Sequence, residues 1–235
     1  LFAHYPYDIR GLGTFTVRYN DGRPDEISAY IKSVRRTRRL SGGAWADPIG
    51  GTDQLADEIE VMSAYPLWYP QYKLLGKRWM LGVAHSKASP WNENEKDQQK
   101  AFPNVDLSGP PYWNPKDEWE PREVYVIEAT MPQEHPYSRK VMYLDADTWV
   151  FYFGEAYDKK GDFWKASIFN MRPLKTQDGG WSIISNQGHT IDLKRRHATI
   201  FVQGKPSRFN TPGVGAKDVS LSVLEAAGQG TFVAK

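Results

Sequence analysis

Residues 123–170 alternate apolar and polar side chains with a period of two, and this pattern most constrains the fold. The segment 123–130 places Val124 and Val126 on one face of a strand and Tyr125 and Ile127 on the other. Short acidic turns separate three further segments of this kind, at 140–144, 150–157 and 162–170. Strands that follow one another through tight turns pair antiparallel, so the pattern predicts an antiparallel meander.

Other parts of the chain extend this sheet. Strands are expected at 13–20, 26–32, 34–40, 72–84 (with a turn at Gly76-Lys77), 181–185, 189–193 and 198–202. The segment 52–63 has apolar residues at 55, 59 and 62, which is the spacing of a helix. A short terminal helix is expected at 218–228, with Gly228 as its C-terminal cap. We therefore predict a mainly β protein with a few short helices.

The segment 85–122 is rich in proline and tryptophan. Six of its residues are proline, at 90, 103, 110, 111, 115 and 121. Proline at this density excludes a helix interior or a central strand, whereas plain disorder is usually poor in aromatic residues. We expect a lid or flap that lies over the sheet.

Composition excludes several classes of function. The 235 residues fit one all-β domain, 1–235, and 30 Lys and Arg against 28 Asp and Glu leave a net charge of +2. Nucleic acid is not an expected partner, because phosphate binding requires a strong positive excess. No stretch reaches the roughly 18 apolar residues of a transmembrane helix. Cysteine is absent, so neither disulfides nor thiolate chemistry is available.

Catalytic and metal-binding motifs do not emerge from the sequence. The five histidines, at 4, 85, 135, 189 and 197, are scattered without metal-site spacing. Neither a nucleophile elbow nor a phosphate-binding glycine loop is present. The carboxylates Asp53, Asp57, Glu58 and Glu60 are expected to form the solvated face of the helix at 52–63. We predict no catalytic residue, no metal and no cofactor.

Four arginines lie within five residues. On a strand, Arg36 and Arg38 share one face, and Arg35 and Arg39 face the other way. One interpretation is a charged edge strand that prevents pairing between sheets. The alternative is a contact with an anionic headgroup or a partner protein, since guanidinium groups bind carboxylate and phosphate in a bidentate manner.

Aromatic residues make up 14% of the chain and are the better functional clue. A flap over a curved sheet can leave space for an apolar molecule, which gains roughly 0.8 kcal/mol per buried methylene. The candidate ligand-binding residues are Trp45, Trp68, Trp91, Trp113, Trp119, Tyr125, Tyr143, Phe151, Phe153 and Trp164.

Several segments resemble a bacterial family of unknown function that is grouped with outer-membrane lipoprotein-sorting (Lol-type) proteins. They are Arg139–Asp145 with Thr148-Trp149, Glu155–Lys165, Arg10–Gly13, Arg35–Leu40, Gly50–Asp53, Trp119–Thr130 and His135–Ser138. The resemblance covers about Tyr7 to Gly228. It implies a periplasmic protein, either free or associated with the outer membrane, with a strongly curved, incomplete antiparallel β-barrel and an apolar cavity.

The resemblance also implies a cellular context. Such proteins are often encoded beside resistance-nodulation-division exporters and outer-membrane components, and they usually have an extra N-terminal region. The chain starts at Leu1 without a signal peptide, so we expect the C-terminal part of a longer protein whose signal peptide lies upstream.

The leading hypothesis is a periplasmic carrier or chaperone for a lipid, a lipoprotein acyl chain or another apolar molecule, working with an envelope exporter. One alternative is an enzyme on a hydrophobic substrate that uses His189 or His197 with an acidic residue. Another is a structural subunit that pairs through its sheet edges.

Overall fold

The chain forms two compact units. The computed structural model describes residues 3, 11–32, 35–40, 44–88, 95–203 and 207–229. The smaller unit comprises Leu1–Trp45 and Thr211–Lys235, and the larger unit is Ala46–Asn210. Within the described residues, no helix has the length and apolar character needed to cross a membrane.

The smaller unit is a three-stranded sheet with one helix. Strands β1 (Gly13–Val17), β2 (Glu26–Ile31) and β3 (Arg36–Leu40) pair antiparallel in that order. Helix α2 (Leu221–Gln229) contacts β1 and β2, and a short 3-10 turn, η5 (Ala216–Asp218), precedes it. The buried Tyr30 lies under this helix, beside Gly228.

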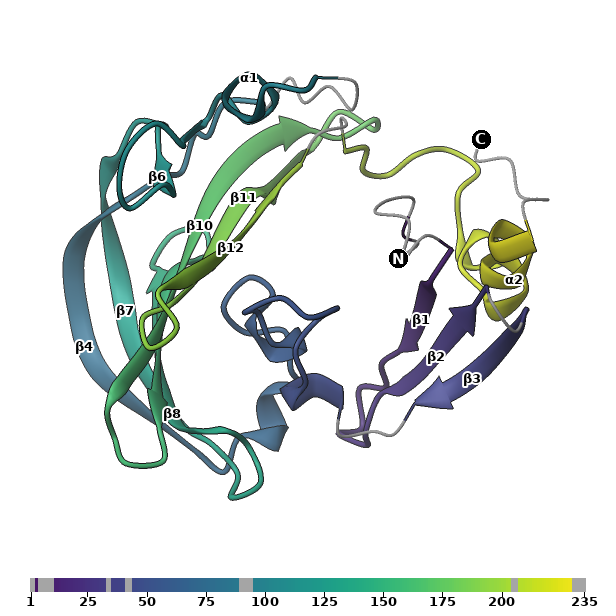
Figure 1. Cartoon of the computed structure of the whole chain (residues 1–235), viewed down its shortest axis with the longest axis horizontal. Helices are drawn as coiled ribbons and strands as arrows, with labels where there is room; N and C mark the ends of the chain where they lie inside the picture. Colours follow the sequence, from purple (N-terminus) through teal and green to yellow (C-terminus); the bar gives the residue numbers. More distant parts are fainter. Residues whose placement is uncertain are drawn as a thin grey trace. The chain divides into compact units, whose positions relative to one another are not determined.

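The larger unit is built on a seven-stranded antiparallel sheet in the order β12-β11-β10-β9-β8-β7-β4. Its strands are β4 (Gln71–Gly82), β7 (Glu120–Thr130), β8 (Tyr137–Asp145), β9 (Phe151–Asp158), β10 (Phe163–Lys175), β11 (Trp181–Asp192) and β12 (His197–Val202). The long strands bend strongly (Figure 1).

Backbone hydrogen bonds partly close this sheet. The chain that leaves the edge strand β4 reaches the second half of β10. There the Met171 amide donates to the Val83 carbonyl, and the Ser86 amide donates to the Met171 carbonyl, both at 2.8 Å. The predicted fold class, a mainly β protein with a strongly curved, incomplete barrel, is confirmed.

Two strand predictions were wrong in detail. β4 runs without a turn through Gly76, which has a φ of 138° at a shift of register against β7. The glycine forms a bulge that bends the strand, because only glycine adopts this backbone conformation readily. Likewise, the two strands predicted at 181–185 and 189–193 form one strand, β11, with a shift of register opposite Asn170 and Met171.

The helix predicted at 52–63 was also wrong. The segment contains only the 3-10 turn η3 (Ala56–Glu58), because Glu60 and Val61 have φ values of 52° and 71°, which end any helix. Two more short turns, η2 (Ala44–Ala46) and η4 (Pro66–Trp68), flank it. We call residues 46–69 the plug segment, which lies against one face of the sheet (Figure 1).

Residues 95–119, here called the flap segment, carry three short elements. They are helix α1 (Gln98–Ala101), β5 (Val105–Asp106) and β6 (Asn114–Pro115), and the last two pair with each other. The Asp97 side chain caps α1 by accepting hydrogen bonds from the amides of Gln99 and Lys100.

Candidate functional site: an apolar pocket and a charged plug

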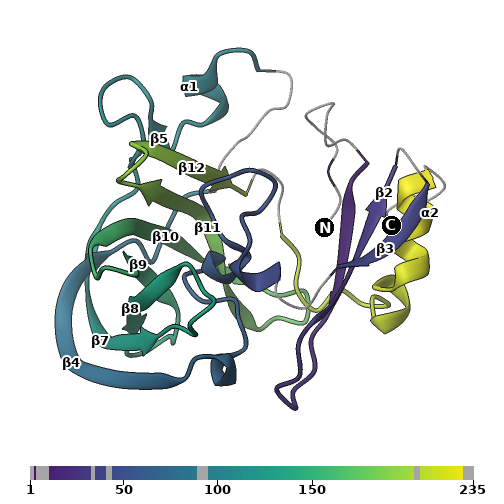
Figure 2. The same cartoon turned by 60° about the horizontal axis from the view of Figure 1, so that its bottom comes forward.

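An apolar pocket lies between the flap segment and strand β12. Its volume is about 190 Å³, and its lining residues are Gln98, Phe102, Val105, Leu107 and Ile200. Figure 2 shows α1 and β5 beside β12, which brings these side chains together. The volume is below the roughly 300–1,000 Å³ of sites for drug-sized molecules. The pocket therefore fits a small apolar group or the end of an alkyl chain.

Buried hydrogen bonds fix the flap segment to the sheet. The Asp117 carboxylate accepts from the Ser86 hydroxyl at 2.6 Å and from the Asn170 amide at 3.0 Å. The Asn186 amide donates to the Ser86 hydroxyl oxygen at 2.9 Å. These side chains are all buried, so the network anchors one end of the flap segment rigidly.

His189 is buried in the same region of the sheet. It pairs across the strands with Ile200, which lines the pocket. Burial lowers the pKa of His189 to about 4, while Asp117 and the backbone of Trp113 act in the opposite direction. The imidazole is therefore neutral at physiological pH.

On the plug segment, two buried carboxylates meet cations of the sheet. Asp57 lies 3.2 Å from the Lys140 ammonium, and Glu58 lies 3.6 Å from the Lys165 ammonium. Lys140 also donates to the Val61 carbonyl. The predicted solvated helix face was therefore wrong at these positions, because both carboxylates turn toward lysines of β8 and β10.

Further contacts secure Asp57. The Tyr69 hydroxyl donates to it, and a ring nitrogen of His135 lies 3.6 Å away. Burial would raise the pKa of the Asp57 carboxyl, but Lys140, His135 and Tyr69 outweigh this effect and lower it to about 2. The charged form is thus the stable form.

A third plug carboxylate, Asp53, contacts strand β12 and the turn before it. Its oxygens lie 2.5 Å from Nδ1 of His197, 3.0 Å from the Thr199 hydroxyl and 3.4 Å from the Arg195 guanidinium. Asp53 is buried, whereas the side chains of His197 and Arg195 are about two-thirds exposed. This cluster joins the plug segment to the outer end of the sheet.

The predicted aromatic ligand residues that the structure describes lie outside the lining of the pocket. Tyr143 and Phe153 form an edge-to-face pair at 5.3 Å, and Trp164 stands edge-on to Tyr137 at 5.4 Å. Tyr125 stacks on the exposed Trp149.

The remaining aromatic candidates are dispersed. Phe151 begins β9, Trp45 lies in η2, and Trp68 ends η4. Trp113 and Trp119 belong to the flap segment, and Trp119 is 42% exposed. Trp91 lies outside the described residues.

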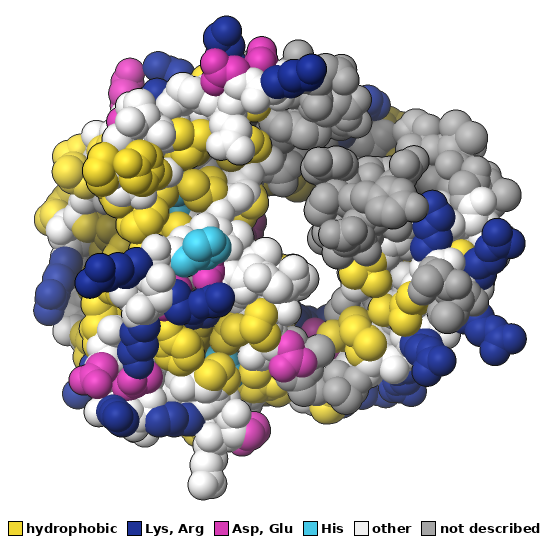
Figure 3. Space-filling view, viewed as in Figure 1, with side chains coloured by type: hydrophobic (Ala, Val, Ile, Leu, Met, Phe, Trp, Pro, Cys, Tyr) yellow, Lys and Arg dark blue, Asp and Glu magenta, His cyan; other side chains and the backbone are white. Residues whose placement is uncertain are grey.

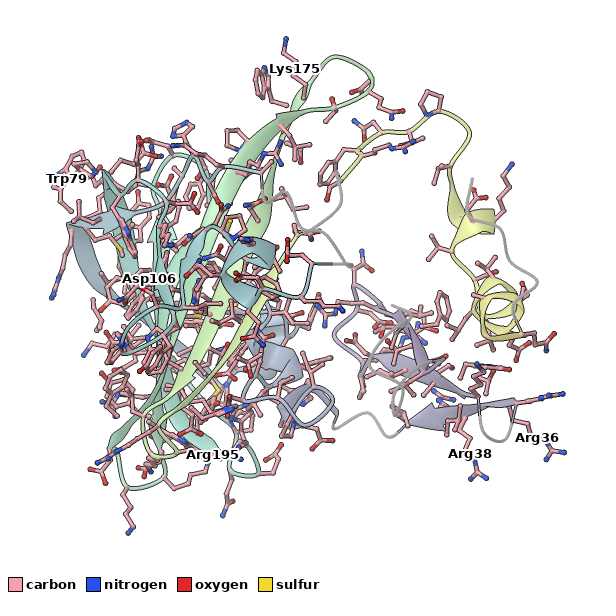
Figure 4. The ribbon with its side chains drawn as sticks, turned by 45° about the horizontal axis from the view of Figure 1, so that its top comes forward. Arg36, Arg38, Trp79, Asp106, Lys175 and Arg195 are labelled. Carbon is pink, nitrogen blue, oxygen red and sulfur yellow. The ribbon has the colours of Figure 1, made fainter. Side chains whose placement is uncertain are left out.

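The arginine run forms the exposed strand β3. Arg36 and Arg38 extend away from it (Figure 4). Arg39 pairs with Glu26 at 3.0 Å, and Arg35, just before the strand, has a φ of 49°. Within the described parts of the chain, no group of three or more histidine and acidic side chains has the arrangement of a metal site.

Sequence reasoning missed both the pocket lining and the buried ion pairs. Phe102, Val105 and Leu107 have no periodic pattern within the proline-rich segment. Lys140 and Lys165 carried a usable signal, because each is a charged residue within an alternating strand and a pair of carboxylates, Asp57 and Glu58, is available elsewhere.

Comparison with known proteins decides the family. A model described as "Protein of unknown function (DUF1329)" matches residues 1–221. The chain belongs to the DUF1329 family. No curated protein matches this DUF1329 protein.

Solved structures share the fold. An outer-membrane lipoprotein-sorting protein domain from Vibrio parahaemolyticus is 16% identical, with a TM-score of 0.62, and the match covers 95% of this chain and 75% of that one. A DUF1329 family protein from Desulfovibrio piger is 20% identical, with a TM-score of 0.60 and coverages of 94% and 74%. A LolA superfamily protein from Nitrosomonas europaea is 14% identical, with a TM-score of 0.50 and coverages of 94% and 76%.

Proposed function

We propose that this DUF1329 protein is a periplasmic carrier that holds an apolar molecule, or the end of an alkyl chain, in the pocket beneath the flap segment. The pocket itself is the observation that carries the proposal, because its lining is apolar except for Gln98. Each methylene buried there contributes roughly 0.8 kcal/mol without any charged anchor. The fold shared with the lipoprotein-sorting domain supports a lipid or a lipoprotein acyl chain as the ligand.

The plug segment suits this role. Asp57 and Glu58 bind cations of the sheet, and Asp53 contacts the Arg195 guanidinium, so this face is filled by a polar, ion-paired segment. An apolar ligand on this face would have to displace the plug segment. That would leave the buried charges without partners, at a cost of several kcal/mol per ion. The flap side is therefore the favourable side for the ligand. A resistance-nodulation-division exporter or an outer-membrane component would receive or supply the ligand.

Binding of a fluorescent fatty-acid probe to the full chain tests this proposal. Ile200→Trp fills the pocket, and we expect at least tenfold weaker binding. Ile183→Trp is the matched control, because Ile183 is 36% exposed on the neighbouring strand β11 and does not line the pocket. Equal affinities of the two variants would contradict the proposal.

The predicted aromatic set remains an alternative location for the ligand. Tyr143→Leu and Phe153→Leu remove a pair of those residues that the sheet brings into mutual contact. If these two substitutions weaken binding of the probe and Ile200→Trp does not, the ligand lies against the sheet away from the flap pocket.

An acid–base enzyme is the second candidate, and one observation favours it. Nδ1 of His197 lies 2.5 Å from the buried Asp53, an arrangement that orients an exposed imidazole as a general base. Hydrolysis of a panel of chromogenic long-chain esters would test it. Turnover that His197→Gln abolishes supports catalysis, and turnover that is absent or unaffected by this change excludes the role for these substrates.

A further inference from the structure

Two neighbouring turns of the large sheet gather cationic side chains at one end of it. The turn between β9 and β10 carries Lys159 and Lys160, and the turn between β11 and β12 carries Lys194, Arg195 and Arg196. All five side chains are exposed. We call residues 158–163 and 192–197 the basic tip.

The two turns are in direct contact. β10 and β11 pair there, with Lys165 opposite Asp192, and the Leu193 amide donates to the Trp164 carbonyl at 3.0 Å. The Lys194 ammonium binds the Asp158 carboxylate, which belongs to the other turn. The cations therefore share one surface, and Figure 3 shows Lys and Arg side chains gathered on this side of the larger unit.

Two of the three acidic residues of the basic tip serve the turns themselves. Asp158 accepts from the amides of Lys160 and Asp162, and Asp192 accepts from the amides of Lys194 and Arg195. Both carboxylates are buried, at 9% and 2% exposure. These two carboxylates thus serve the backbone of the turns, with Lys194 as a further partner of Asp158, and the third, Asp162, is exposed among the cations.

Exposed apolar side chains accompany the cations. Phe163 is 43% exposed and Leu193 is 44% exposed, one on each of the contacting turns. Cations with apolar side chains among them match the interface of an anionic bilayer, where charges meet the headgroups and apolar groups enter the acyl boundary.

We propose that the basic tip docks on the surface of a bilayer that contains anionic phospholipid. The proposal is independent of the ligand pocket, because neither turn contributes a residue to the pocket lining. Lys160 and Arg196 are the cations to test, since within the described residues neither forms an ion pair. Lys194 and Arg195 are unsuitable because they bind Asp158 and Asp53.

Co-sedimentation of the full chain with vesicles tests the docking. Vesicles of phosphatidylcholine with 30% phosphatidylglycerol are expected to bind the protein, and pure phosphatidylcholine vesicles are not. Each cation near an anionic surface contributes roughly fivefold in affinity, so Lys160→Gln with Arg196→Gln should weaken binding about 25-fold. Lys73→Gln with Lys175→Gln removes the same charge from exposed positions of β4 and β10 and should have little effect.

A second variant separates a bilayer from other anionic partners. Phe163→Ser with Leu193→Ser keeps every charge, and weaker vesicle binding is expected. If this variant binds vesicles normally and poly-glutamate binds equally well, the surface recognises acidic polypeptides and the proposal fails. Displacement of the vesicles by 10 mM inorganic phosphate at constant ionic strength would show a free-phosphate site instead.

The arginines of β3 provide the final comparison. Arg36→Gln with Arg38→Gln tests the headgroup contact predicted from the sequence. If only this variant loses vesicle binding, the membrane contact lies on β3 and the proposal for the basic tip is overturned. An absence of binding to either vesicle type would overturn it as well.

Discussion

The ammonium group of Lys140 lies 3.2 Å from the Asp57 carboxylate, and both side chains are buried. Lys140 belongs to the sheet and Asp57 to the plug segment, so this contact holds together two parts of the chain that are 83 residues apart. The lysine also donates to carbonyls of the plug segment, those of Asp57 and Val61. Lys140 therefore holds the plug segment both through the Asp57 carboxylate and through two backbone carbonyls.

Removing that cation should destabilise the protein strongly. Lys140→Met leaves Asp57 buried without its main partner, and the expected loss in the free energy of unfolding is about 3–5 kcal/mol. Adding Asp57→Leu should recover much of the loss, because the charge left behind disappears. Urea-induced unfolding measures both values. Lys73→Met, at an exposed position of β4, is the control and should change stability by less than about 0.5 kcal/mol. An equal effect of the two lysine substitutions would contradict the assigned role of Lys140.

Acid should reduce stability in two stages. The folded-state pKa of His189 is lowered from 6.5 to about 4, so between these values the unfolded chain binds more protons and stability falls as the pH falls. Asp57 has a folded-state pKa of about 2 instead of 3.8, so its contribution is complete above pH 3.8 and is lost toward pH 2. The two shifts correspond to roughly 3 and 2 kcal/mol.

Unfolding in urea at a series of pH values separates the two groups. His189→Leu should remove most of the decline between pH 6.5 and 4 and leave the loss below pH 3.8. A variant that declines as wild type does above pH 4 would show that His189 does not control this stage. His85→Leu, at an exposed histidine, is the control and should keep the wild-type profile.

Much of the fold follows from the sequence because strand alternation is a local signal. The segments from 123 to 170 became β7 to β10 with boundaries shifted by a few residues. Gly76 was misread because glycine serves both a turn and a bulge, and only the pairing partner distinguishes the two. The flap pocket was not predictable at the level of residues, because its walls come from an irregular segment and from Ile200, about one hundred positions away.

The plug segment shows a different limit. The apolar residues at 55, 59 and 62 have helical spacing, yet the chain turns at Glu60 and Val61. Local propensity was overridden by long-range contacts, since Glu58 accepts a hydrogen bond from the Tyr137 hydroxyl and Asp57 pairs with Lys140. A single sequence can flag a lysine within an alternating strand, but it does not show which carboxylate pairs with that lysine.

Gly154 allows the plug segment to lie close to β9. A Cβ atom at this position would lie 2.6 Å from Cγ1 of Val61. Gly154→Ala should therefore cost about 1–3 kcal/mol through overpacking, even though alanine is otherwise acceptable in a strand. Adding Val61→Ala should remove the clash. In the Gly154→Ala background, Val61→Ala should therefore lower the free energy of unfolding by less than it does in the wild-type protein. Chemical denaturation of the two single variants and the double variant measures this coupling, and strictly additive effects would contradict the contact.

Gly228 plays the corresponding part in the smaller unit, where the sequence suggested a helix cap. The helix continues to Gln229, and a Cβ atom on Gly228 would lie 2.1 Å from Cε1 of the buried Tyr30. Helix propensity favours Gly228→Ala by up to about 1 kcal/mol, but the clash with a buried ring outweighs this gain. We expect α2 to detach from β2, with loss of the 2.7 Å hydrogen bond from the Thr37 hydroxyl to Glu225.

Amide hydrogen exchange across 221–229 measures this detachment, and Gly228→Ala should increase the exchange rates at least tenfold. In a Tyr30→Leu background the same substitution should be neutral or slightly protective, because the ring is gone and only the propensity remains. Gly215→Ala is the matched control, since no atom lies within 4 Å of its Cβ position. Unchanged exchange in Gly228→Ala would mean that α2 can shift along the sheet without losing its packing, and that close approach at Tyr30 is not what fixes the helix.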